Sequence, residues 1–88
     1  MTIDITLRSG TMVDPAVAAA GIVRKCRQCK SKVCISRGEI KNADGRSLNQ
    51  VYCLATIHDP HITIVISGKD ELRVMCDLVD MVNHGTGI

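Results

Sequence analysis

The chain has 88 residues, a formal net charge of +2 and Tyr52 as its single aromatic residue. So small a charge gives no reason to expect nucleic acid as a direct partner, and no apolar run approaches the ~18–20 residues of a membrane span. Five cysteines in a chain without a signal-peptide pattern favour reduced thiols and a cytoplasmic location. We expect a single domain over residues 1–88 that does not bind a membrane.

The first half of the chain predicts a strand, a helix and a hairpin. Apolar and polar residues alternate over residues 2–8, which indicates a strand with one buried face. A helix is expected over about residues 15–29, because Asp14 suits its N-cap and a proline follows. Residues 31–36 and 40–44 predict two hairpin strands. The basic residues near the helix are interpreted as its solvated C-terminal end: Arg24, Lys25, Arg27, Lys30 and Lys32.

The second half predicts a short helix, a strand and a final helix. Ser47 and Gln50 match a capping box, in which each side chain accepts a hydrogen bond from the other residue's backbone amide. Residues 61–67 form the strongest strand pattern, and a helix after Asp70 is expected to end before Gly85. The helical side chains expected to face inward are Ala16, Ala19, Val23, Cys26, Leu48, Val51, Cys53, Leu54, Ala55, Leu72, Met75, Cys76, Val79 and Val82.

The element order is therefore βαββαβα. Every predicted strand has one apolar face and every predicted helix has one apolar stripe. Such elements bury their apolar sides in two layers, so we expect an α+β fold with a four-stranded sheet, helices on one face and the other face open.

This order and length resemble the histidine-containing phosphocarrier protein (HPr) family of the sugar phosphotransferase system. The resemblance covers nearly the whole chain and implies an open-faced β-sandwich with an antiparallel sheet. It also implies a protein that catalyses no reaction alone and needs no cofactor. The stretches that carry it are Ile3-x-Ile5-x-Leu7, Gly10-x-x-x-x-Pro15-Ala16, Arg46-Ser47-Leu48 and Ile62-x-Ile64-x-Ile66-x-Gly68.

The residues that would carry phosphoryl transfer in this family differ here. The resemblance implies a phosphorylatable histidine at the position of Met12 and an arginine at the position of Asp14. A thioether cannot carry a phosphoryl group as imidazole nitrogen does, and a carboxylate repels the anion that an arginine pairs with. We therefore expect no carrier chemistry at this degenerate site.

A second family position is preserved at Ser47. In some bacteria a serine that opens the short helix is phosphorylated by a dedicated kinase, and some members lack the histidine and act only in regulation. The resemblance thus implies a regulatory protein-binding module, switched at Ser47, which docks through Met12, Val13, Arg46 and Leu48. Its partners would be phosphotransferase-system enzymes, a serine kinase or a transcription regulator. An N-cap without any switch stays open as the simpler role of Ser47.

Cys26, Cys29 and Cys34 leave a second hypothesis open, a small protein that responds to metal or redox state through its thiols. Against it, residues three apart on a helix share a face, and here that face is apolar. A redox pair belongs at a helix N-terminus, where the dipole lowers the thiol pKa, but these cysteines are expected at the C-terminal end. We therefore interpret the cysteines as structural and expect no metal site.

His58 and His61 flank an expected turn and are interpreted as surface residues. A substitute phosphohistidine at either position stays an alternative. The family topology implies that both lie at the end of the sheet opposite Cys29.

Overall fold

The computed structural model describes residues 1–6, 15–57 and 59–83, and the side chains of all of these except 82 and 83. The expected cap Asp14, the end of the first predicted strand and Gly85 lie outside these residues. The observed order βαββαβα confirms the prediction. The elements are β1 (Thr2–Thr6), α1 (Pro15–Gln28), β2 (Lys32–Arg37), β3 (Ile40–Asp44), α2 (Leu48–Ala55), β4 (His61–Ser67) and α3 (Glu71–Asn83).

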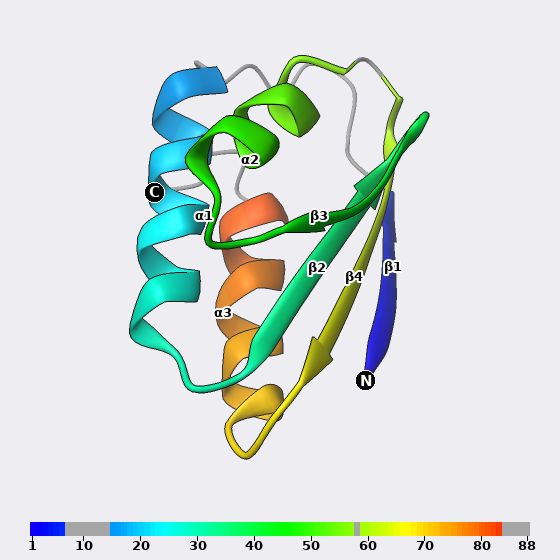
Figure 1. Ribbon diagram of the computed structural model, residues 1–88. Coiled ribbons are helices and arrows are strands. Elements are labelled where there is room, and N and C mark those ends of the chain that lie inside the picture. Colours follow the sequence, from blue (N-terminus) through cyan, green and yellow to red (C-terminus); the bar gives the residue numbers. More distant parts are fainter. Residues whose placement is uncertain (7–14, 58, 84–88) are drawn as a thin grey trace.

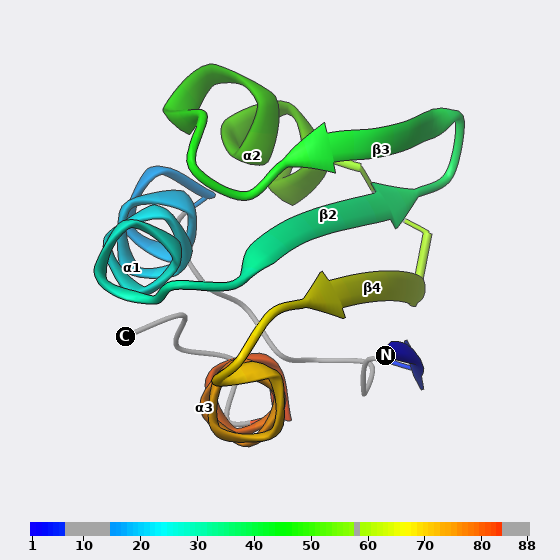
Figure 2. The ribbon, with the colours of Figure 1, turned by 60° about the horizontal axis from the view of Figure 1, so that its bottom comes forward.

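The four strands form one antiparallel sheet in the order β1-β4-β2-β3. The hairpin of β2 and β3 contains a register shift between Ile35 and Arg37. All three helices lie against one face of the sheet, and the other face is open (Figures 1 and 2). The expected open-faced α+β sandwich is therefore confirmed. No helix in the described part of the chain is long and apolar enough to cross a bilayer.

The core lies between the sheet and the helices. Alternate residues of the strands, such as Ile64 and Ile66 of β4, point into it. Each fully buried aliphatic side chain of this kind contributes about 1.5–3 kcal/mol. A smaller cluster of Ala19, Val23 and Val51 joins α1 to α2. The main cluster contains Ile5, Cys26, Val33, Ile35, Ala43, Leu54, Ile64, Ile66, Val74 and Leu78.

Several helical residues face the solvent instead of the core, which corrects the sequence prediction. In α3 the buried residues are Val74 and Leu78, one position out of phase with the predicted stripe. Apolar residues occur around more than half of this helix, so two neighbouring faces fit the same pattern. The residues predicted to face inward and found exposed are Ala16, Leu48, Cys53, Leu72 and Cys76.

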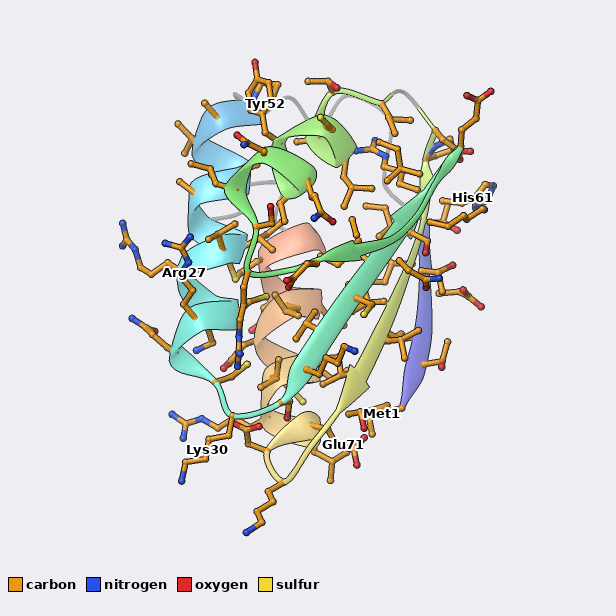
Figure 3. The ribbon with its side chains drawn as sticks, viewed as in Figure 1. Met1, Arg27, Lys30, Tyr52, His61 and Glu71 are labelled. Atoms are coloured by element: carbon orange, nitrogen blue, oxygen red, sulfur yellow. The ribbon has the colours of Figure 1, made fainter. Side chains whose placement is uncertain are left out.

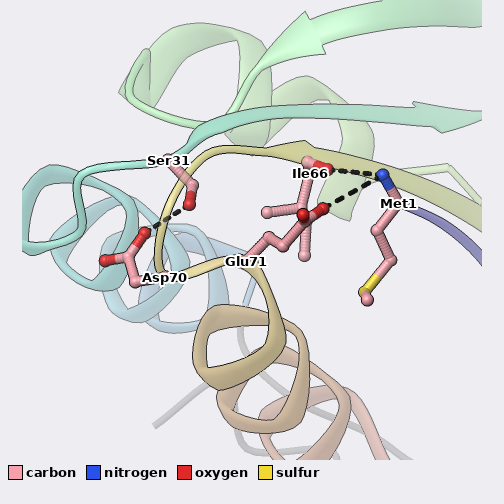
Figure 4. Close-up of polar contacts among 5 residues, drawn as sticks. All are labelled: Met1, Ser31, Ile66, Asp70 and Glu71. Carbon is pink, nitrogen blue, oxygen red and sulfur yellow. Dashed lines mark hydrogen bonds and ion pairs between the residues drawn. The ribbon is translucent and has the colours of Figure 1, made fainter.

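The α1–β2 and β4–α3 connections are joined by the carboxylate of Asp70 (Figure 4). Its Oδ2 accepts from the backbone N–H of Lys30 at 3.0 Å, and its Oδ1 accepts from the hydroxyl of Ser31. Ser31 is fully buried and is the one buried polar side chain in the part of the chain described. A Cβ on Gly68 would stand 2.6 Å from the Cα of Ser31, so this approach requires glycine.

The start of β1 joins the same region from the other side. The amino group of Met1 donates to the carbonyl of Ile66 at 2.8 Å and lies 3.2 Å from a carboxylate oxygen of Glu71 (Figure 4). The carbonyl of Met1 accepts from the Ile66 N–H at 2.7 Å. The end of β4 and the start of α3 are therefore held on two sides.

The Asp70 contacts predict a pH dependence of stability. Hydrogen bonds from the Lys30 amide and the Ser31 hydroxyl lower the pKa of Asp70. A lowered pKa in the folded state stabilises the fold above the unfolded value of about 3.9, and the effect is lost as the pH falls through the folded value. We expect Asp70→Asn to lower the urea midpoint at pH 7, and to lower it less at pH 3, with circular dichroism as the readout. The same deficit at both pH values would contradict this role of the carboxylate.

Candidate functional site

The site that the structure describes is the start of α2 with the part of α1 beside it. Met12, Val13 and Asp14, at the expected degenerate phosphorylation position, lie outside the described residues, and so does His58. Two residues of the expected docking surface, Arg46 and Leu48, and the expected regulatory residue Ser47 are described.

Ser47 is the N-cap of α2, as predicted. Its backbone is extended, with φ −97° and ψ 112°, and its side-chain oxygen accepts from the Gln50 N–H at 3.5 Å. The second half of the predicted capping box is wrong. The Gln50 side chain accepts from the Asp44 N–H at 2.8 Å, while the Ser47 N–H donates to the Asp44 carbonyl at 3.0 Å. Ser47 is partly exposed, so its hydroxyl lies at the surface.

Arg46 caps the end of α1. Its Nε donates to the carbonyl of Cys26 at 3.1 Å, and its Nη2 donates to the carbonyls of Cys29 at 3.0 Å and Ser31 at 3.5 Å. The last carbonyls of a helix have no partner inside it and carry the negative end of its dipole, so a guanidinium stabilises them well. Arg46 was expected to contact a partner, but its guanidinium stabilises the end of α1. The sequence did not predict this role.

Arg27 approaches the same turn from α1. Its Nε donates at 3.3 Å to the carbonyl of Arg46, which belongs to the peptide bond that leads into Ser47. Lys25 points elsewhere, since its Nζ lies 2.7 Å from Asp77 on α3. Figure 3 shows Arg27 on α1, beside the segment that enters α2. The basic end of α1 is therefore partly engaged in specific contacts instead of being wholly solvated.

Large apolar side chains are exposed on the two helices that flank Ser47. On α2, Leu48 is 48% exposed and Tyr52 is 45% exposed, and on α1 Val17 is 42% exposed. Tyr52 projects away from the sheet (Figure 3). A contiguous exposed apolar patch marks a surface that docks a protein partner, whereas single exposed apolar side chains are common on any protein.

The structure does not bring the three candidate thiols together. Cys26 is fully buried on the helix side of the sheet, 2.8 Å from where a Cβ of Gly45 would stand. Cys34 alternates along β2 with buried Val33 and Ile35, so it lies on the open face. Cys29 donates to two backbone carbonyls. In the described residues, no three His, Cys, Asp or Glu side chains lie where they could hold a metal ion.

Burial also makes Cys26 a poor nucleophile and a poor metal ligand. Desolvation, with a smaller effect from Cys29, raises the pKa of the Cys26 thiol to about 12. Only the thiolate attacks disulfides or binds metals, so a raised pKa suppresses both reactions. The thiol hypothesis is accordingly not favoured.

His61 lies at the start of β4, at the opposite end of that strand from Gly68 and the Ser31 connection. It is exposed, and its Nδ1 is 3.3 Å from the hydroxyl of Thr6. The expectation that it is remote from Cys29, two residues before Ser31, is confirmed by this arrangement.

Comparison with known proteins gives consistent results. The protein-family model described as "PTS HPr component phosphorylation site" matches residues 2–84 of this chain. A search of the curated proteins finds no match.

Among solved structures, HPr-C-His from Thermoanaerobacter tengcongensis is 22% identical with a TM-score of 0.70, covering 100% of this chain and 94% of that one. The histidine-containing phosphocarrier protein of Mycoplasma is 15% identical with a TM-score of 0.74, covering 98% and 97%. Crh of Bacillus subtilis, the catabolite repression containing protein, is 21% identical with a TM-score of 0.62, covering 88% and 79%. At these identities the likeness shows the fold.

The Arg46 contacts predict a loss of stability on substitution. We expect Arg46→Ala to lower the free energy of unfolding by about 1–3 kcal/mol, because charged hydrogen bonds to three carbonyls, one in the last turn of α1 and two in the connection after it, are lost. Arg46→Lys keeps the charge but not the fork of donors, so it should recover only part of this loss. Arg24→Ala, at an exposed position on α1, is the control and should change stability by less than ~0.5 kcal/mol. Equal stability of the Arg46→Ala and Arg24→Ala variants would refute the capping role.

The burial of Cys26 predicts selective thiol reactivity. At pH 8 a pKa of about 12 leaves roughly one Cys26 in ten thousand as thiolate, whereas Cys53 and Cys76 are exposed. Alkylation of the folded protein, mapped by mass spectrometry, should label Cys53 and Cys76 first and Cys26 only after denaturant is added. Labelling of Cys26 at the rate of Cys53 in the folded protein would show that this thiol is accessible after all.

Proposed function

This chain belongs to the HPr family of the phosphotransferase system, and from that premise we propose that it is a regulatory protein-binding module and not a phosphocarrier. In this proposal the switch is Ser47, and the exposed side chains of α1 and α2 receive the partner. HPr-family proteins interact with other proteins of the phosphotransferase system and are typically carriers without catalysis of their own, so no enzymatic activity is proposed.

The argument against carrier activity lies in the side-chain chemistry of two positions. Met12 stands where the family resemblance requires a histidine, and Asp14 stands where it requires an arginine. The first offers no nitrogen for a phosphoryl group, and the second places a negative charge beside any incoming phosphate. Both residues therefore disfavour phosphoryl transfer at this position.

The observation that carries the regulatory proposal is the position of Ser47 at the N-cap of α2, with its hydroxyl at the surface. A phosphate there would meet the free N–H groups of the first helical turn and the positive end of the helix dipole. In the transfer, the Oγ–P bond forms as the bond between the γ-phosphorus of ATP and its bridging oxygen breaks, and the serine proton passes to the kinase. A charge would then stand directly beside exposed Leu48.

The docking surface is proposed to comprise Met12, Val13 and Leu48, with Tyr52 added because it is exposed on the same helix as Leu48. Arg46 belongs to this surface only indirectly, since its guanidinium is bound to α1. The proposed partners are phosphotransferase-system enzymes, a serine kinase or a transcription regulator. We further propose that residues 1–88 act as a single domain in the cytoplasm, without a direct contact to nucleic acid or membrane.

Two phosphorylation reactions test this function. The protein is incubated with the phosphoenolpyruvate-dependent enzyme of the sugar system, and separately with an HPr serine kinase and ATP. We expect no phosphate in the first reaction and one acid-stable phosphate on Ser47 in the second, measured by intact mass and peptide mapping. The physical reasons are the missing imidazole at position 12 and the exposed hydroxyl of Ser47.

An active carrier HPr is the positive control for both enzymes, and Ser47→Ala is the matched negative control for the kinase. An acid-labile phosphohistidine in the first reaction would make the protein a carrier, with His58 or His61 as the acceptor. No phosphate in either reaction would leave Ser47 as a helix cap and would overturn the proposed switch.

A further inference from the structure

Arg27 contacts the peptide group that leads into Ser47. Its Nε donates at 3.3 Å to the carbonyl of Arg46, and that carbonyl is part of the peptide group whose nitrogen belongs to Ser47. The contact joins residues 19 positions apart in the sequence and links α1 to the start of α2. It is exposed to solvent, so an anion has access to the guanidinium.

Arg46, the cation next to Ser47 in the sequence, is bound to other groups. Arg46 uses its Nε and Nη2 on the carbonyls of Cys26, Cys29 and Ser31 at the end of α1. By contrast, Arg27 forms no ion pair with any carboxylate among the described residues and makes a single long hydrogen bond to a neutral carbonyl.

We propose that Arg27 is the internal partner of a phosphate on Ser47, pairing with it across the α1–α2 contact. The inference rests on the proposed modification of Ser47 and specifies which side chain receives the new charge. A phosphate oxygen is a much stronger acceptor than a peptide carbonyl, and guanidinium binds phosphate through two parallel N–H···O bonds. The carbonyl of Arg46 would lose its bond to Arg27, and the phosphate would gain two.

The other groups at this turn set the electrostatic background. Asp44 accepts from the Arg46 N–H at 2.9 Å through its carboxylate and opposes a second negative charge. The Gln50 amide, which binds the Asp44 N–H at 2.8 Å, is uncharged. Arg46 contributes positive charge, but its guanidinium is already bound to the carbonyls of Cys26 and Cys29. Without Arg27, the phosphate would therefore have only Arg46 as a nearby cation among the groups described at this turn, and the carboxylate of Asp44 would repel it.

This pairing has a consequence for recognition. A phosphate already paired with Arg27 presents a compact phosphate–guanidinium surface beside exposed Leu48, in place of an isolated dianion. A partner would not need to supply all of the compensating positive charge. The phosphate would also tie α1 to α2 more firmly, in addition to the apolar contact of Ala19, Val23 and Val51.

The test uses the full chain with phosphoserine installed at position 47 during translation, so no kinase is needed. The second pKa of the phosphate, ordinarily about 6, is measured by ³¹P NMR titration. Pairing with a cation favours the dianion, so Arg27→Gln should raise this pKa by roughly half a unit. Arg73→Gln, at an exposed position in the first turn of α3, is the matched control for net charge and should leave it unchanged.

Equal phosphate pKa values in the wild type and Arg27→Gln would overturn the pairing, and so would an equal rise in both variants. Arg27→Lys should give an intermediate value, because it keeps the charge without the fork of donors. At 1 M salt the difference in phosphate pKa between the wild type and Arg27→Gln should shrink, since the screening length falls to about 3 Å. The two inferences fail separately: the kinase reaction decides whether Ser47 is modified, and the titration decides what Arg27 does once it is.

Discussion

The carboxylate of Asp70 is the contact on which the arrangement of the other elements most depends. It binds the Lys30 N–H and the buried hydroxyl of Ser31, and so joins the connection before β2 to the connection after β4. These two strands are the central pair of the sheet. A buried hydroxyl without a partner would be costly, so the contact is required once Ser31 is enclosed. Glycine at position 68 is needed for these two segments of the chain to come this close.

The same contact determines how α3 lies on the sheet. Asp70 immediately precedes the helix, and Glu71 in its first turn meets the amino group of Met1. With its first turn held on both sides, the helix presents Val74 and Leu78 to the core and leaves Leu72 and Cys76 exposed. The apolar pattern alone fits more than one rotation of this helix, and the polar contacts at its start select one.

Two arginines bind backbone carbonyls at the C-terminal ends of the other two helices. Arg46 binds the last carbonyls of α1, and Arg37 binds the carbonyl of Leu54 at the end of α2 at 3.1 Å and that of Asp59 at 2.7 Å. Partial burial lowers the pKa of Arg37. These arginines supply donors from other elements to carbonyls at or near the ends of two helices. The start of α2, where Ser47 lies, is thereby fastened to α1, so a change of charge there acts on both helices.

Local pattern was enough to determine the element order, the two-layer fold and the cap at Ser47, because each depends on periodicity or on residues a few positions apart. The family followed from the resemblance of four stretches to known proteins, and the family model confirms it. It was not enough for contacts between distant segments. The tertiary structure alone decided that Arg46 caps α1, that Gln50 binds Asp44 and that Cys26 and Cys34 lie on opposite sides of the sheet. These outcomes depend on which segments the folded chain brings together. Sequence spacing carries no information about that once the residues belong to different elements.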